Sequence, residues 1–332
     1  MTDSFWIMIT LIAYMIVLVM IGVWAQKRTT DQDDYFLGGR QLGPWVASLS
    51  ASASSSSAWS LLGVSGTAYA VGMEAFWFLP GVLGGYLFSW SYIAPRLRQA
   101  TERDEAVTLS ELLFGRFERD GSNAVIRSAA IIVLVSLMFY IAAQFQGAGL
   151  AFSSSFGMAP TVAILFGAAI VLVYTLIGGF WAVAVTDAVQ ALLMVSVAAL
   201  LPVLCLMEVG GFAGLWAGMA AVEDEVFLSF TGKYSGLAAV GFVFGMLSPG
   251  VAYMGQPHVV NRFMAIKDNE SLRQGRIIAV GWASIVFSGM LVLGWSARVL
   301  FPITGNEEQI FFHATQQLLP PVIAGMMIAG VL

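Results

Sequence analysis

The sequence predicts an all-α membrane protein, a single bundle of membrane-spanning helices with no separate soluble domain. Of its 332 residues, 58% are hydrophobic and 11% are charged, whereas soluble globular domains average about 25% charged residues. Apolar runs of about 20 residues, each long enough to cross a bilayer as a helix, recur along the whole chain. Two of these runs are interrupted near their middle by residues that disfavour a continuous helix.

We expect eight complete spans and the start of a ninth near Leu319. The first run begins after Asp3 rather than after a basic segment and lacks a clear cleavage site, so we expect it to remain as a span. Because the ninth apolar segment stops after about 14 residues at Leu332, too few to cross a bilayer, we expect the chain to continue beyond this sequence. The eight expected spans are 4–25, 42–71, 75–95, 128–152, 159–177, 181–207, 235–254 and 277–297.

The basic residues predict how the chain is oriented in the membrane. All but Lys233 and Arg298 of the 15 lysines and arginines lie in the loops 26–41, 96–127 and 256–276. Short loops rich in Lys and Arg stay in the cytoplasm. We therefore expect a multi-pass protein of the cytoplasmic (inner) membrane, with its N-terminus outside and its first loop inside.

The two interruptions are the main pointers to function. The second span contains Ser52-Ala53-Ser54-Ser55-Ser56-Ser57, and the seventh contains Ser248-Pro249-Gly250. Unpaired backbone groups cost several kcal/mol in hydrocarbon, so broken helices persist only where protein or a cavity surrounds them. If the first span is set aside, spans two and seven each open a five-span unit, as in transporters built from inverted repeats. The alternatives are a small-residue packing face for the serines and a tolerated kink for Pro249.

Polar groups at these positions suit ions and small solutes. Serine hydroxyls and freed carbonyls are oxygen ligands of the kind that a hard cation such as Na⁺ requires. Tyr140, Tyr253 and Trp59 are candidates for lining a solute path, with ordinary helix packing as the alternative. Asp187 is the one acidic residue inside an apolar segment, which makes it a functional candidate by default. A role in ion coupling and a structural pairing, with an arginine such as Arg40, both remain open for it.

Several kinds of chemistry have no support in the sequence. There is no phosphate-binding loop, no Cys/His spacing for a metal and no nucleophile motif, and the single Cys205 excludes an internal disulfide. We therefore expect a protein that is not an enzyme. Its expected partners are a small-molecule solute and the lipid bilayer, not nucleic acid.

Motifs along the whole chain resemble those of the sodium:solute symporter family, most closely its sodium/proline symporters. They come in the same order and at similar spacing. The motifs are Asp34-Tyr35-Phe36-Leu37-Gly38-Gly39-Arg40-Gln41-Leu42-Gly43-Pro44, the stretch 50–63, Tyr174-Thr175-Leu176-Ile177-Gly178-Gly179-Phe180-Trp181-Ala182-Val183, Thr186-Asp187 with Gln190, and Gly255-Gln256-Pro257-His258 before Arg262-Phe263-Met264-Ala265.

The resemblance implies a leucine-transporter-type fold of two inverted five-helix repeats. Residues 4–25 would form an extra N-terminal helix, 42–207 the first repeat and 235–332 an incomplete second repeat. The carbonyls of Ala53 and Ser56 would bind Na⁺, the co-transported ion. The remaining implied roles are substrate binding or gating for Ser57, Trp59, Tyr140, Tyr253 and Pro257, and ion coupling for Arg40 and Asp187.

The chain departs from this pattern in three places. Ser55 stands where proline carriers have an aspartate, so this ion-coupling position lacks a charge. Pro249 stands where they have a tryptophan, which bears on whether proline is the solute. The Ser/Thr ligands that complete the family's Na⁺ site would follow Leu332.

The leading hypothesis is therefore Na⁺-coupled symport of a small organic solute, proline or another amino acid. A second hypothesis couples the same transport to protons, with Asp187 as the titrating group. A third is a solute sensor, in which a transporter-like bundle reports to a signalling domain. Na⁺ replacement, an Asp187→Asn variant and the sequence beyond Leu332 would discriminate among the three.

Overall fold

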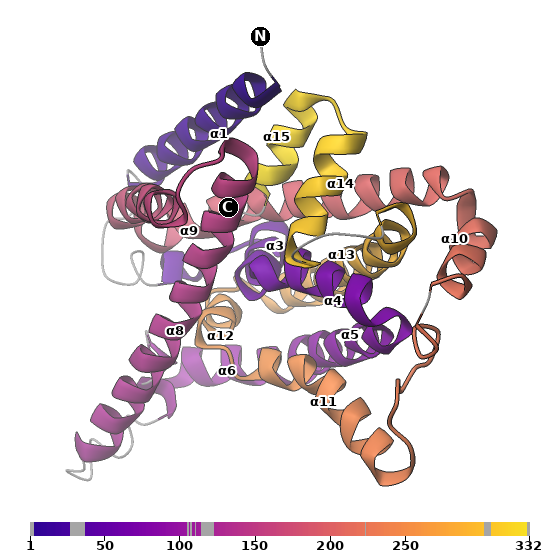
Figure 1. Ribbon diagram of the computed structural model, residues 1–332. Coiled ribbons are helices and arrows are strands. Elements are labelled where there is room, and N and C mark those ends of the chain that lie inside the picture. The colour runs from indigo at the N-terminus through magenta and orange to yellow at the C-terminus, as the bar shows by residue number, and fades with distance from the viewer. Residues whose placement is uncertain are drawn as a thin grey trace.

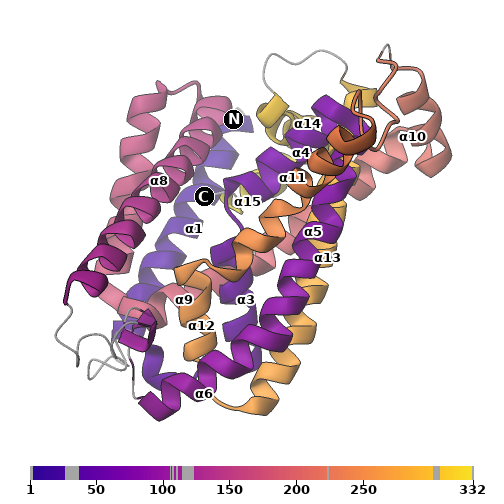
Figure 2. The same cartoon turned by 90° about the horizontal axis from the view of Figure 1, so that it is seen from below.

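The computed structural model describes residues 3–26, 37–104, 106, 108–109, 111–113, 123–222, 224–301 and 307–330. This part of the chain is almost entirely helical, and its one β feature is an isolated parallel bridge between Leu42 and Ile266. Figures 1 and 2 show the helices gathered into one bundle, with α12 beside α3 and α11 beside α5. The predicted all-α class is confirmed.

The elements fall into long helices and shorter pieces that interrupt or join them. The long helices are α1 (Asp3–Gln26), α8 (Asn123–Phe156), α9 (Pro160–Glu208), α11 (Gly236–Met254) and α13 (Asn269–Leu300). The shorter helices are α3 (Pro44–Ser55), α4 (Val64–Val71), α5 (Phe78–Phe88), α6 (Ala94–Asp104), α10 (Gly211–Ala220), α12 (Pro257–Met264), α14 (Ile310–Leu318) and α15 (Pro321–Ala329). Two π-helical turns, η2 (Trp59–Gly63) and η4 (Ser89–Ile93), and three 3₁₀ turns, η1 (Gly38–Arg40), η3 (Gly72–Trp77) and η5 (Glu307–Gln309), connect them.

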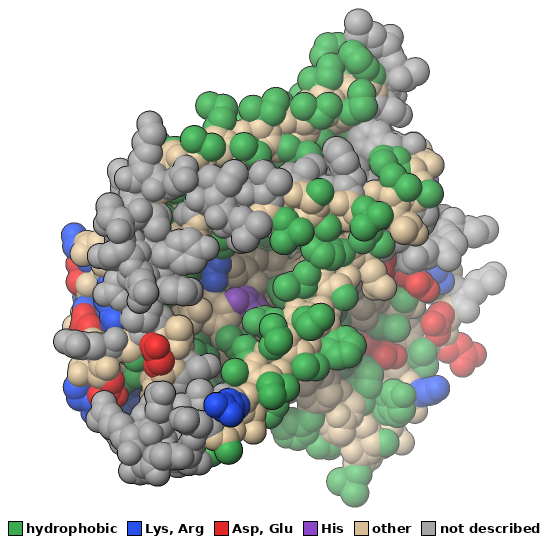
Figure 3. Space-filling model, turned by 90° about the vertical axis from the view of Figure 1, so that its left-hand side faces the viewer, with side chains coloured by type: hydrophobic (Ala, Val, Ile, Leu, Met, Phe, Trp, Pro, Cys, Tyr) green, Lys and Arg blue, Asp and Glu red, His purple; other side chains and the backbone are tan. Residues whose placement is uncertain are grey.

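The length and surface of the helices are those of an integral membrane protein. In the described part of the chain, six helical stretches are long and apolar enough to cross a membrane: Phe5–Ala25, Trp59–Asp104, Arg127–Gly149, Gly179–Glu208, Gly236–Met254 and Asn269–Leu300. Their outward side chains are apolar, and Leu237, for example, is 90% exposed. Figure 3 shows charged side chains gathered toward two opposite edges of one face, with hydrophobic side chains between them.

A glycine divides α9 into the two spans that the sequence predicts. Gly179 has φ 60° and ψ −157°, a backbone conformation that is essentially restricted to glycine. The chain therefore turns between the expected spans 159–177 and 181–207. The Gly178-Gly179 pair is what permits this turn.

The serine-rich run unwinds as predicted. Helix α3 ends at Ser55, Ser56 is extended with φ −95° and ψ 108°, and helical geometry resumes at Ala58. The backbone N–H of Ser56 donates to the carbonyls of Ser52 and Ala53, at 3.0 Å in each case. The break therefore costs fewer hydrogen bonds than an open loop would.

The second break lies elsewhere than predicted. Helix α11 runs through Ser248-Pro249-Gly250 to Met254, and the chain unwinds instead at Gly255 and Gln256. The prediction at Pro249 is therefore wrong. The cause is Pro257, because the residue before a proline is forced out of the helical region, and Gln256 has φ −71° and ψ 114°. Pro257 then takes the first position of α12, where its missing N–H costs nothing.

Gly250 serves helix packing instead of unwinding. A Cβ on Gly250 would overlap the carbonyl oxygen of Gly81, and a Cβ on Gly85 would overlap that of Gly250. Glycines at these positions let α5 and α11 approach until their backbones touch, as small residues do between membrane helices. The alternative stated for Pro249, a proline tolerated within a helix, is therefore the one that the structure shows.

The apolar segment expected to begin a ninth span starts with a helix, α15. Leu319 is extended and separates α14 from α15. Helix α15 spans Pro321–Ala329, with Pro321 in its first turn. It packs on α1, where Gly325 lies against Ile7 and Thr10.

The segment before α3 and the segment after α12 are hydrogen-bonded to each other on the side expected to be cytoplasmic. Before α3, the N–H of Leu42 donates to Ala265 at 3.1 Å, and the N–H of Lys267, after α12, donates back to Leu42 at 3.1 Å. Buried Arg98 of α6 donates to the carbonyl of Ile266 at 3.1 Å. The segments that precede α3 and follow α12 are thus fastened to each other.

Helix α13 begins on the same side with a carboxylate cap. The side chain of Asp268 accepts from the backbone N–H of Ser271 at 2.7 Å. This hydrogen bond holds the pKa of Asp268 below its ordinary value, because it favours the charged form. The cap satisfies one of the open N–H groups of the first turn.

Candidate functional site

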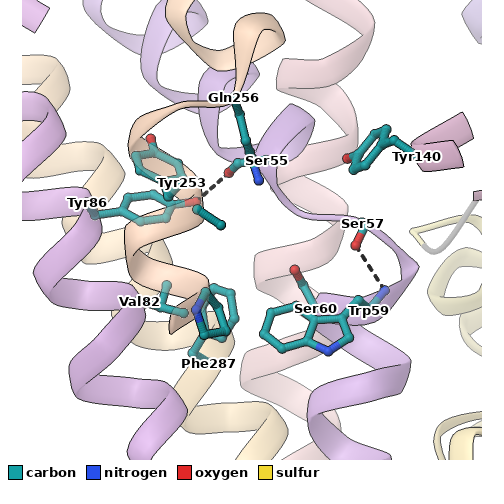
Figure 4. A pocket seen from close by; sticks show the side chains of 12 residues that line it. Ser55, Ser57, Trp59, Ser60, Val82, Tyr86, Tyr140, Tyr253, Gln256 and Phe287 are labelled. Atoms are coloured by element: carbon teal, nitrogen blue, oxygen red, sulfur yellow. Dashed lines mark hydrogen bonds between the residues drawn. The ribbon is translucent and has the colours of Figure 1, made fainter. Parts of the chain in front are cut away.

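A cavity of about 210 Å³ lies between the two helix breaks. Figure 4 shows side chains from the first break, from α5, α8 and α13, and from the end of α11 converging on it. The residues that line it are Ser55, Ser57, Trp59, Ser60, Val82, Tyr86, Tyr140, Pro249, Ala252, Tyr253, Gln256 and Phe287.

One wall of the cavity carries the hydroxyl groups of Ser55, Tyr86 and Tyr253, each held by hydrogen bonds. The Ser55 hydroxyl donates to the carbonyl of Ser52 at 2.9 Å and lies 2.7 Å from that of Tyr86. Since Ser55 has a single proton, Tyr86 is the donor in the second bond. The Tyr86 ring stacks on Tyr253 with centroids 4.1 Å apart, and Trp90 donates to the Tyr253 hydroxyl at 3.1 Å. Both phenols are therefore held in place.

The opposite wall is apolar and aromatic. Trp59 meets Phe78 edge to face, with centroids 5.3 Å apart, and lies 6.3 Å from Phe287. Trp59 remains 38% exposed, and its ring lies beside Ser60 in the cavity (Figure 4). The cavity thus offers hydroxyls on one side and ring faces on the other, the usual composition of a small-molecule site.

Helix α8 stabilises the first break from the side. The Tyr140 hydroxyl donates to the carbonyl of Ser54 at 2.9 Å, before the break. The Gln144 side chain accepts from the backbone N–H of Ala58 at 3.0 Å, after it. These contacts supply partners to backbone groups that the missing helical turn would have paired, which is the condition for irregular backbone at membrane depth.

A buried ion pair lies next to the same break. The guanidinium of Arg262, on α12, donates to the carboxylate of Asp187, on α9, at 2.6 Å, and their side chains are 6% and 14% exposed. Ser50 and Ser54 of α3 each donate to the same carboxylate oxygen at 2.8 Å. Arg262 also donates to the Ser50 hydroxyl and to the carbonyl of His258. The pair therefore ties α3, α9 and α12 together.

The suggested pairing of Asp187 with Arg40 is wrong. Arg40 lies in η1 and donates to the carbonyl of Ala106 at 3.1 Å, while Asp187 is bonded to Arg262. The sequence places both arginines on the same side of the membrane. Only Arg262 is carried by a half-helix that packs against α3, and this decides the partner.

The other predicted residues divide between the cavity and its border. Ser55, Ser57, Trp59, Tyr140 and Tyr253 line it. Pro257 does not; it begins α12 directly after the lining residue Gln256. Ala53 lies in the last turn of α3 and Ser56 at the first non-helical position, so their carbonyls stand at the break. Among described residues, no cluster of three His, Cys, Asp or Glu could hold a metal.

Sequence reasoning missed part of the site. Tyr86 is a phenol in the middle of an otherwise apolar span, a signal equal to that used for Tyr140. Ser60 continues the serine run after Trp59 and is 1% exposed beside the cavity. Arg262 was visible only as part of a motif, because its position depends on the break before Pro257.

Comparison with known proteins agrees with this architecture. Residues 35–332 match the sodium:solute symporter family. The chain belongs to this family.

Curated relatives include the osmoregulated proline transporter OpuE of Bacillus subtilis, which is 35% identical over 331 residues. The sodium/proline symporter of Escherichia coli is 34% identical over 334 residues. These alignments cover 98% of this chain but 66% and 65% of the relatives. The chain therefore spans about two thirds of the length of these symporter-family proteins.

A solved structure confirms the fold. A Na⁺-coupled sialic acid symporter in a substrate-bound, outward-open state superimposes with a TM-score of 0.83. It is 21% identical in sequence, and the match covers 100% of this chain and 69% of that one. The leucine-transporter-type fold implied by the motifs is thus the fold of this family member.

Proposed function

We propose that the protein is a secondary transporter that carries a small organic solute together with Na⁺ across the cytoplasmic membrane. The observation that supports this most strongly is the pair of backbone breaks, at Ser56-Ser57 and at Gly255-Gln256, on either side of one cavity. In a member of the sodium:solute symporter family, such a cavity is the place for the solute. Transport of this kind needs no covalent chemistry, so we propose no enzymatic activity.

The solute we propose is an amino acid, with proline first among the candidates because it appears in the relatives' names. The residues that line the cavity carry hydroxyl, amide and aromatic groups and no ionised side chain. A zwitterion fits this wall if its carboxylate faces the N-terminal end of α12 and its ammonium faces the C-terminal end of α3, in accord with the helix dipoles. The ring of Trp59 would cover its apolar part.

The ion would bind at the end of α3. We propose that the carbonyl oxygens of Ala53 and Ser56 coordinate Na⁺, with the neutral Ser55 beside them. Na⁺ bound there would favour the unwound form of α3 and so prepare the cavity for solute. One Na⁺ that moves down about 100 mV releases roughly 2.3 kcal/mol to drive uptake.

The organisation of the chain in the membrane follows from the same proposal. We place the N-terminus outside and the loops rich in Lys and Arg in the cytoplasm. Residues 4–25 are then an extra helix, 42–207 the first repeat, and 235–332 the beginning of the second. The half-helices α3 and α12 extend from the breaks toward the cytoplasm.

Replacement of Na⁺ tests the proposed coupling. In proteoliposomes that hold the protein, we expect uptake of radiolabelled proline to fall to background when external Na⁺ is replaced by choline or K⁺. An inward Na⁺ gradient should drive accumulation, and a collapsed gradient should abolish it. Undiminished uptake in choline would reject Na⁺ coupling. Na⁺-driven uptake of another amino acid, without uptake of proline, would support Na⁺ coupling and reject proline as the solute.

Removal of the Tyr140 hydroxyl tests the support of the first break. In Tyr140→Phe the carbonyl of Ser54 loses its donor, at a net cost of about 1 kcal/mol. We expect the solute KM to rise by up to about tenfold while the amount of folded protein is unchanged. Tyr234→Phe, at an exposed position outside the cavity, is the matched control. An unaltered KM in Tyr140→Phe would show that the Tyr140 hydroxyl is not needed for solute binding.

A further inference from the structure

A cationic and aromatic surface lies where η4 and α6 meet α13, away from the cavity. Arg96 extends over the ring of Tyr92, with its guanidinium carbon 3.5 Å from the ring centroid, and donates to the Tyr92 carbonyl at 2.9 Å. Arg276 of α13 donates to the hydroxyl of Ser91 at 3.4 Å. We call these four residues the arginine–tyrosine surface. It joins elements that are almost 200 residues apart in the chain.

The positive charge of this surface is not balanced by the protein. Within the described residues, no carboxylate lies within 4.0 Å of Arg96 or Arg276, nor of the exposed Arg273 one turn away. Arg98, Arg103 and Arg262 behave differently, since each is paired with an acid. A guanidinium has five N–H donors, and one bond to the protein is found for each of Arg96 and Arg276. Most of their donors therefore remain for an anion.

Close packing of α13 on η4 builds this surface. A Cβ on Gly275 would press on the ring of Trp90, so only glycine lets α13 approach the π-helical turn this closely. The contact places Arg276, the next residue, against Ser91. The wider π-helical turn presents Tyr92 outward, half exposed, and such turns in other proteins often mark functional sites.

The position of the surface relative to the membrane indicates its ligand. Toward the bilayer it continues into apolar side chains that point outward, with Phe88 47% and Ile277 68% exposed. Phe88 stacks on Tyr92 with centroids 5.1 Å apart. Toward the cytoplasm lie Arg98 and Lys267 of the basic loops. In the membrane orientation proposed above, the arginine–tyrosine surface would lie at the level of the lipid headgroups, where tyrosine and arginine are typical.

We propose that the arginine–tyrosine surface binds the phosphate headgroup of an anionic phospholipid in the cytoplasmic leaflet. The guanidinium groups of Arg96 and Arg276 would donate to the phosphate oxygens from two sides, in the manner that favours arginine for phosphate. An acyl chain would lie along Phe88 and Ile277. Basic pockets between helices on the cytoplasmic side recognise anionic headgroups in this way. The inference rests on the proposed orientation in the membrane and not on the transported solute or ion.

Thermal unfolding in a neutral detergent tests the proposal. Phosphatidylglycerol added to the purified protein should raise its Tm by several degrees, and phosphatidylcholine should not. In the double variant Arg96→Gln/Arg276→Gln we expect about a tenfold or larger rise in the phosphatidylglycerol concentration that gives half of the effect. Arg103→Gln, on the same α6 but already paired with Asp104, is the matched control and should respond like the parent protein.

Three results would overturn it. These are an equal response of the double variant to phosphatidylglycerol, an equal response of the parent protein to phosphatidylcholine, and the same Tm rise with inorganic phosphate alone. If the double variant fails to fold, the single Arg96→Gln is measured, because among the described residues the hydrogen bond and ring contact of this exposed side chain are both with Tyr92 of its own turn. Native mass spectrometry then counts the phosphatidylglycerol molecules retained by each variant.

Discussion

Replacing Arg262 by alanine is expected to lower the free energy of unfolding by about 3–5 kcal/mol, because it leaves the carboxylate of Asp187 buried without its counter-charge. The two serine hydroxyls that also bond Asp187 do not compensate a full charge. Equilibrium unfolding in mixed micelles measures the loss. Solute uptake should fall to background, since α3 and α12 lose the ion pair that ties both of them to α9.

The paired variant separates structure from transport. Asp187→Leu/Arg262→Met removes both charges and should recover most of the lost stability, as replacement of buried pairs by apolar residues often does. Uptake should stay at background if the charges take part in coupling. Arg103→Ala breaks an exposed pair and should leave both quantities unchanged. Unaltered stability in Arg262→Ala would contradict a stabilising role of the ion pair. Normal uptake in the double variant would show that the pair stabilises the fold but takes no part in coupling.

The second large effect is expected at Gly250. In Gly250→Ala the new methyl group overlaps the carbonyl oxygen of Gly81, so α5 and α11 must separate along the wall of the cavity. We expect a loss of about 1–3 kcal/mol or more and strongly reduced uptake, measured by unfolding and by proteoliposome transport. Valine at this position should abolish folding.

A control lies on the same helix. In Gly245→Ala the added methyl group meets nothing within 4 Å. This substitution should leave the protein as stable as the parent or slightly more so, because alanine favours the helix by about 1 kcal/mol over glycine. Equal behaviour of the two variants would show that the contact between α5 and α11 does not matter for stability.

The sequence predicts those parts of the fold that depend on local chemistry. Four serines in an apolar run weaken the helix at that place, and the chain does unwind at Ser56. Pro249 and Pro257 show the limit of such reasoning, because both are capable of ending a helix. What distinguishes them is the tertiary contact of Gly250 with α5, which holds α11 together around Pro249. Nothing in the local sequence of α11 reports that contact.

Part of the candidate site could also be predicted from the sequence. Polar aromatics inside spans, such as Tyr140 and Tyr253, led to cavity residues, and Tyr86 carried the same signal. The partner of Asp187 could not be inferred, because proximity across three helices depends on how they cross. Basic loop residues all look alike in sequence, yet one of them, Arg262, turns inward from α12.

The backbone bridge between Leu42 and Ile266 has a consequence for how the breaks work. Its two hydrogen bonds, together with that of Arg98 to Ile266, fasten the segment before α3 to the segment after α12, so we expect the two half-helices to move together about the unwound residues. If the protein carries solute and Na⁺ as proposed, a tilt of α12 on solute binding would be passed to α3 and to the ion proposed at its last carbonyls. Solute binding would then favour ion binding through the joined half-helices, without direct contact between solute and ion.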